Sequence, residues 1–121
     1  MSMRSAVIAA GLFLAGTAAL SAGPARLSPD DIKATFFNGK PFTAATPSKV
    51  RFRMVFTADG KVTRTPLAKK GAKGAGTWAL NQDGFCTTWK GAKPNCFRII
   101  VAGANSWSVM QGTTVVATWS R

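Results

Sequence analysis

The stretch from Gly74 to Arg98 constrains the fold of this chain more than any other part of it. It contains two segments of strand-like composition with an Asp83-Gly84 turn signal between them, and it holds both cysteines of the chain. An Asp-Gly pair between such segments is typical of a β-hairpin. The stretch therefore predicts an antiparallel β-meander that a disulfide bond pins together.

The first residues predict an export signal. Met1–Arg4 is short and positively charged, Ser5–Leu20 is apolar and rich in small residues, and small residues then precede Pro24. This order is that of a cleaved secretory signal peptide, for which we expect residues 1–23. The rival interpretation, a membrane anchor, is disfavoured because an apolar run of about 16 residues is shorter than the roughly 20 that a span needs. We expect residues 24–121 to form a single disulfide-containing β-domain, periplasmic or secreted.

Export determines what we expect of the two cysteines. Cys86 and Cys96 of a small exported domain should form one disulfide, which contributes about 2.5–3 kcal/mol in the chain-entropy description. A metal site is rejected because the chain has no His and few carboxylates. A tight turn at Gly91–Pro94 would pair Cys86 with Ile99, so the disulfide requires a wider loop.

Local signals predict one short helix followed by strands. Within Leu27–Gly39, Ser28 suits the N-cap, Pro29 suits the first helical position, and Asp30 and Asp31 suit the positive end of the helix. Alternation is clearest in 49–57, where Val50, Phe52, Met54 and Phe56 would face a core. We expect strands at 40–43, 49–57, 61–65, 76–80, 85–89, 96–102, 106–110 and 113–119, and a loop at 44–48. Val62, Trp78, Leu80, Phe85, Thr87, Trp89, Phe97, Ile99 and Val101 should point inward.

The predicted fold class is all-β with one short N-terminal helix. The strands form an up-and-down antiparallel meander of seven or eight members, in a small lipocalin-like barrel or a strongly curled sheet. Alternate connections of a meander lie at one end, so the two Lys-Gly-Ala-Lys loops at 70–73 and 90–93 should share an end. We call the six lysines expected there the lysine rim, a candidate anion-binding surface: Lys49, Lys69, Lys70, Lys73, Lys90 and Lys93. Asp59 and Asp83 should lie at the opposite end.

The available side chains disfavour enzymatic activity. The chain has no His and no Glu, and its four Asp have capping or turn explanations. No Ser-x-x-Lys motif, phosphate-binding loop, dinucleotide-binding motif or metal-ligand cluster is present in the sequence. We therefore expect a protein that is not an enzyme and that uses no cofactor and no metal.

Binding is the remaining function, and the inside of the barrel is its second candidate surface. Four tryptophans are expected there: Trp78, Trp89, Trp107 and Trp119. A small barrel can hold a ligand in its mouth, although an ordinary packed core is the favoured explanation for these rings. Basic residues among aromatics also suit single-stranded nucleic acid, but export disfavours nucleic acid as a natural partner.

Several short motifs carry a resemblance: Phe56-Thr57-Ala58-Asp59-Gly60, Gly76-Thr77-Trp78, the run Asp83–Trp89, and Cys96-Phe97. The pattern resembles small exported proteobacterial proteins classed as domains of unknown function. In these, a Phe-x-x-Asp-Gly turn, a Gly-Thr-Trp strand and a Cys…Cys-Phe hairpin build a compact lipocalin-like β-domain. The resemblance implies a fold and a compartment, and it assigns no functional residue.

Taken together, these features predict an exported, non-enzymatic binding protein. With a formal charge of +12, its cationic rim would engage anionic partners such as envelope polysaccharide, a lipid headgroup or an acidic protein. The alternatives are a structural or envelope-associated protein without a small ligand, and an inhibitor of an acidic secreted enzyme. The sequence carries no signal for an oligomeric state.

Overall fold

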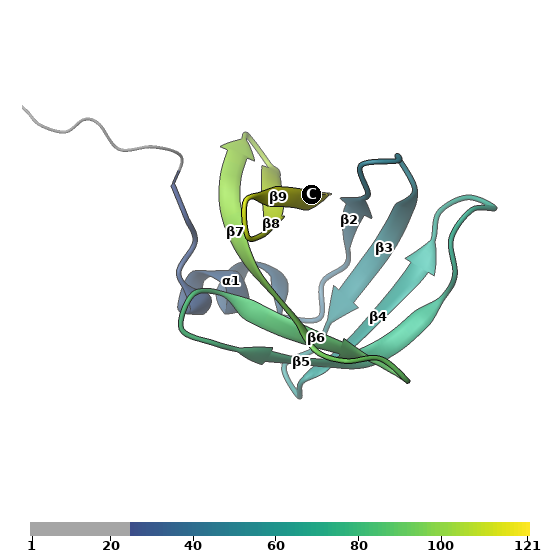
Figure 1. Cartoon of the computed structure of the whole chain (residues 1–121), viewed down its shortest axis with the longest axis horizontal. Coiled ribbons are helices and arrows are strands. Elements are labelled where there is room, and N and C mark those ends of the chain that lie inside the picture. The colour runs from purple at the N-terminus through teal and green to yellow at the C-terminus, as the bar shows by residue number, and fades with distance from the viewer. Residues whose placement is uncertain (1–24) are drawn as a thin grey trace, which may run out of the picture.

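Eight antiparallel strands form a closed barrel in chain order, and one short helix precedes them (Figure 1). The structure is a computed structural model that describes residues 25–121, so the predicted signal peptide lies outside the described residues. The elements are α1 (Pro29–Phe36), β2 (Phe42–Ala45), β3 (Arg51–Phe56), β4 (Lys61–Pro66), β5 (Gly74–Leu80), β6 (Phe85–Trp89), β7 (Asn95–Gly103), β8 (Ser106–Gln111) and β9 (Thr114–Ser120). The predicted fold class is confirmed in its closed form, with eight strands.

The barrel closes through pairing of β2 with β9, in which Ala44 lies opposite Trp119. The sequence placed the first strand at 40–43 and a loop at 44–48, and these bounds are wrong. Ala44 is buried inside the barrel, and Ala45 continues the strand by pairing with Arg51 and Thr118. A pair of alanines carries no strand signal of its own, so only the barrel closure sets this boundary.

The helix α1 fills one end of the barrel. Its predicted N-cap is confirmed, because the Ser28 hydroxyl accepts a hydrogen bond from the Asp31 backbone N–H at 3.1 Å. The side chains of Ile32, Phe36 and Phe37 are completely or almost completely buried. Phe37 stacks on Phe56 with ring centroids 4.3 Å apart. The helix therefore supplies the floor of the core, and we call this end the closed end.

The segment before α1 also belongs to the sheet. The Leu27 N–H donates to the Ile99 carbonyl at 2.9 Å, and the Val101 N–H donates to the Ala25 carbonyl at 2.8 Å. These bonds pair the segment with the part of β7 that extends beyond β6. Val101 lies in this extension with 39% of its surface exposed, so its predicted burial is wrong.

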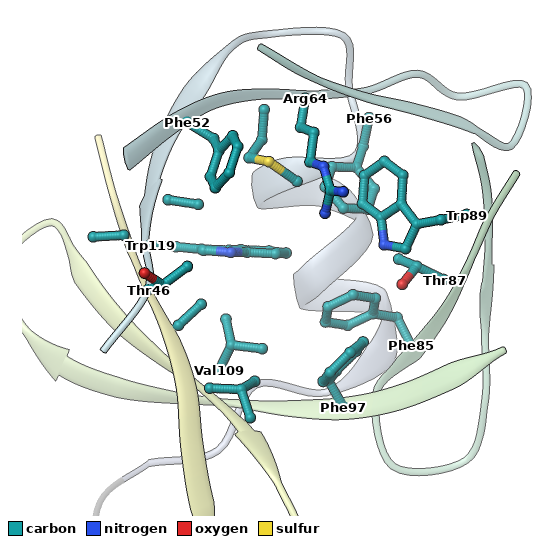
Figure 2. A pocket seen from close by; sticks show the side chains of 15 residues that line it. Thr46, Phe52, Phe56, Arg64, Phe85, Thr87, Trp89, Phe97, Val109 and Trp119 are labelled. Carbon is teal, nitrogen blue, oxygen red and sulfur yellow. The ribbon is translucent and has the colours of Figure 1, made fainter. Parts of the chain in front are cut away.

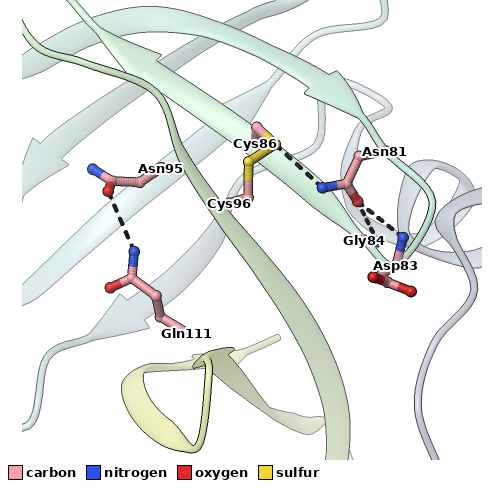
Figure 3. The surroundings of a disulfide bond; sticks show 7 residues. All are labelled: Asn81, Asp83, Gly84, Cys86, Asn95, Cys96 and Gln111. Carbon is pink, nitrogen blue, oxygen red and sulfur yellow. Dashed lines mark hydrogen bonds between the residues drawn. A yellow bond between two sulfur atoms is a disulfide. The ribbon is translucent and has the colours of Figure 1, made fainter.

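The disulfide bond between Cys86 and Cys96 links β6 to β7 (Figure 3). The two cysteines lie opposite each other in register, and the pairing of β6 with β7 ends at Thr87 and Asn95, which leaves the wide connection that this register requires. The neighbouring turn is stabilised by Asn81, whose side-chain oxygen accepts hydrogen bonds from the backbone N–H groups of Asp83 and Gly84. A disulfide is consistent with an oxidising compartment outside the cytoplasm. In residues 25–121, no helix has the length and apolar character to cross a membrane.

Candidate functional site

The end of the barrel opposite α1 is formed by the loops β2–β3, β4–β5, β6–β7 and β8–β9. We call it the mouth. The two Lys-Gly-Ala-Lys loops are β4–β5 and β6–β7, so they lie at the same end, as the sequence predicted. All six lysines of the rim are exposed on the first three of these loops.

The structure places five of the six rim lysines in two groups. Lys49, Lys69 and Lys70 line an external hollow of about 440 Å³ between the β2–β3 and β4–β5 loops. Lys73 and Lys90 line a second hollow of about 260 Å³, further round the mouth. Lys93 is exposed on the β6–β7 loop and lines neither hollow.

The four Asp lie away from the mouth. Asp30 and Asp31 are on the first turn of α1, and Asp59 and Asp83 occupy the β3–β4 and β5–β6 turns at the closed end. Among residues 25–121 one ion pair is present, between Lys61 and Asp59 at 3.8 Å, and both side chains are well exposed. Within the part of the chain that the structure describes, the lysines at the mouth therefore have no acidic partner.

Inside the mouth lies a cavity of about 240 Å³, which we call the mouth cavity (Figure 2). Figure 2 shows α1 behind the side chains that line it. Aromatic and aliphatic groups make up most of its wall, and the polar side chains are those of Thr46, Arg64 and Thr87. Its larger apolar lining residues are Phe52, Met54, Phe56, Phe85, Trp89, Phe97, Val109, Val116 and Trp119.

Arg64 is the charged group of this cavity. It lies on β4, and its guanidinium points toward the middle of the barrel (Figure 2). Its Cζ atom lies 4.5 Å from the centroid of the Trp89 ring and 5.5 Å from that of Phe52. The Nε atom is buried and has no hydrogen-bond partner. A buried donor without a partner costs about 1–3 kcal/mol, so a ligand that compensates this guanidinium would gain from it.

Glycine on the neighbouring strand makes room for this side chain. Gly74 of β5 pairs with Arg64, and a Cβ atom at position 74 would lie 2.9 Å from the Arg64 Nε. It would also lie 3.3 Å from the Cε3 atom of Trp89. The absence of a side chain at position 74 therefore allows the arginine and the indole to stack inside the barrel.

The four tryptophans predicted in the interior have two different roles. Trp89 and Trp119 line the mouth cavity. Trp78, Trp107 and Trp119 pack against the rings at the closed end. Trp78 lies 4.4 Å from the Phe37 ring, and Trp107 and Trp119 each lie 4.9 Å from the Phe36 ring, between centroids. The Trp78 indole N–H also donates a hydrogen bond to the Thr57 carbonyl at 2.8 Å. The interior is thus filled at the closed end and hollow at the mouth.

Sequence reasoning missed Arg64. The signal for it was present, because Val62 was expected to point inward and side chains two residues apart on a strand face the same way. A charged residue at an inward position marks a functional site more often than an ordinary core. In residues 25–121, no group of three or more His, Cys, Asp or Glu side chains could hold a metal ion.

Comparison with protein-family models, with curated proteins and with solved structures finds no match to this chain. What the protein can bind must therefore be argued from the geometry of the mouth itself.

Proposed function

We propose that this is an exported, non-enzymatic binding protein that engages anionic partners through the lysine rim. The partner class is an anionic polymer or surface, such as envelope polysaccharide, lipid headgroups or an acidic protein. Export follows from the predicted signal peptide and agrees with the disulfide bond. We also propose that the barrel is lipocalin-like and that the protein is related to the exported proteobacterial β-proteins that its motifs resemble.

One observation carries the proposal: the six rim lysines gather at the mouth, whereas all four Asp lie toward the closed end. The lysines of the closed end, Lys33, Lys40 and Lys61, share it with those carboxylates. Charges of one sign concentrated on one face attract polyanions and raise their association rate. Because the rim lysines are exposed, this attraction should weaken as salt screens it.

Retention on immobilised heparin, followed as the salt concentration rises, tests the rim. A variant in which Lys70, Lys73, Lys90 and Lys93 are all replaced by Ala should elute at much lower salt than the wild-type protein. Circular dichroism should show that the variant remains folded, because all four side chains are exposed on loops.

A matched control removes the same amount of charge elsewhere. Lys33, Lys40, Arg53 and Lys61 are exposed and lie outside the mouth loops, so replacing them by Ala lowers the net charge equally. This control should keep most of the retention of the wild-type protein. Equal losses in both variants would show that net charge alone binds heparin, and elution of the wild type at low salt would favour a structural protein without an anion site.

A further inference from the structure

We propose that the mouth cavity is a binding site for a small apolar monocarboxylate, with Arg64 as the residue that pairs with the carboxylate. This site adjoins the lysine rim, because Arg64 and Trp89 also line the hollow that Lys73 and Lys90 share. It differs from the rim in its apolar wall and in the residue that pairs with the anion. It would take the acid head against the guanidinium and the apolar body against the aromatic wall.

The case for an anion begins with the missing partner of Arg64. An arginine guanidinium carries a positive charge, and no acidic side chain lines the cavity. The protein also leaves its buried Nε without a hydrogen-bond partner. A charge held among apolar groups is costly unless it is paired, so the folded protein favours a ligand that brings the opposite charge.

The arginine is held in place before any ligand arrives. Trp89 and Phe52 flank the guanidinium at 4.5 Å and 5.5 Å, and Gly74 leaves the space that this position needs. Stacking on an aromatic face restricts the flexible arginine side chain. A carboxylate then meets a planar fork of donors that is already oriented, which lowers the entropic cost of binding.

The size and lining of the cavity define the rest of the ligand. Since one water accounts for about 30 Å³ of the liquid, 240 Å³ gives room for at least about eight non-hydrogen atoms. Phe85, Phe97, Val109 and Trp119 offer an apolar surface to such a body. One guanidinium directed inward suits a single negative charge. A short aliphatic acid or an aromatic acid fits both requirements.

Isothermal titration calorimetry of the full-length mature protein with octanoate, octan-1-ol and octylamine tests this site. Octanoate should bind more tightly than octan-1-ol, and octylamine should show no binding. Arg64→Met keeps an unbranched side chain in place of the arginine stem and removes the guanidinium, so octanoate binding should weaken about 10- to 100-fold. Octan-1-ol binding by this variant should not weaken, because the apolar wall remains.

Three further variants keep the test decisive. Arg53→Met removes an arginine that points outward on β3, and it should leave octanoate binding unchanged. The four-lysine rim variant should also keep it, so that failure of the rim proposal and failure of this one are distinguishable. If Arg64→Met does not fold, Arg64→Lys retains the charge without the planar fork and should bind octanoate less tightly than the wild type.

Equal binding of octanoate and octan-1-ol by the wild type would overturn the proposal, as would no binding of either. It would also be overturned if the Arg64 variants bound octanoate as well as the wild type does, or if the rim variant alone lost binding.

Discussion

Arg64 of β4 and Trp89 of β6 stack on each other across β5, with the guanidinium carbon 4.5 Å from the centroid of the indole. The two side chains come from strands that do not pair with each other, and the strand between them passes without a side chain at Gly74. A cation and an aromatic ring therefore occupy the mouth of a barrel whose other end is filled by the rings around α1.

Gly74→Ala should disturb this stack. The added methyl would lie 2.9 Å from the Arg64 Nε and 3.3 Å from the Trp89 Cε3, so the guanidinium must move away from the ring. Loss of the cation–π contact should lower the free energy of unfolding by about 0.5–2 kcal/mol, as measured by urea denaturation. Gly103→Ala is the matched control, because a methyl there meets no atom within 4 Å. Equal effects of the two substitutions would contradict the role assigned to Gly74.

Phe37→Ala should destabilise the barrel strongly. Phe37 is 1% exposed and contacts the rings of Phe56, Trp78 and Phe85. Truncating a fully buried Phe costs about 3–5 kcal/mol, since it removes apolar contact and leaves a cavity. Chemical denaturation measures this loss. Phe52→Ala at the hollow mouth should cost less, and a larger loss there would show that the mouth, not the helix, holds the core together.

Removal of the disulfide should lower stability without changing the fold. Replacing Cys86 and Cys96 together by Ala removes the cross-link that restricts the segment between them in the unfolded chain. The chain-entropy relation gives a loss of about 3 kcal/mol in the free energy of unfolding. Urea denaturation with and without reductant measures it. Reductant should lower the stability of the wild type and leave that of the double variant unchanged, whereas an insensitive wild type would argue that the bond contributes little.

The pKa of the Asp59 carboxyl should lie below its ordinary value of 3.8. The main cause is the hydrogen bond that the Thr57 hydroxyl donates to it, and the charge of Lys61 acts in the same direction. A depressed pKa in the folded state means that this contribution to stability is present above the unfolded pKa. It is lost as the pH falls through the folded pKa. The group is fully exposed, so the effect on stability is small.

Titration of the Asp59 side-chain carbon by NMR measures this pKa directly. Thr57→Val should raise it toward the ordinary value, and Lys61→Met should raise it less, because the hydroxyl is the larger cause. The reverse order of the two variants would assign the shift to charge instead.

Much of the scaffold was predictable because its signals are local. Ser28 and Pro29 mark the start of α1, and the alternation of Phe52, Met54 and Phe56 gives an inward face that the structure confirms. The loops of the mouth follow from the order of an antiparallel meander. The bounds of β2 were missed because Ala44 acquires its place only when β9 closes the barrel.

The mouth cavity was not predictable in the same way. Whether a barrel is hollow depends on how side chains from several strands fill it, and that is a property of the closed sheet. Four tryptophans were expected inside, but the sequence does not show how their roles differ. Trp78 and Trp107 pack against the rings at the closed end, Trp89 lines the cavity, and Trp119 does both. The alternation of inward and outward positions could have predicted that Arg64 points inward. That its Nε atom has no hydrogen-bond partner could be learned only from the structure.

The separation of the rim lysines from the four Asp also determines how the protein approaches a partner. Positive charge concentrated at the mouth, with the four Asp offset by lysines at the closed end, gives the molecule a permanent dipole moment along its axis. Near a negatively charged surface, at separations within the screening length, this moment exerts a torque that rotates the barrel before contact. A barrel rotated in this way would meet the surface with Arg64 and its cavity first and with α1 behind.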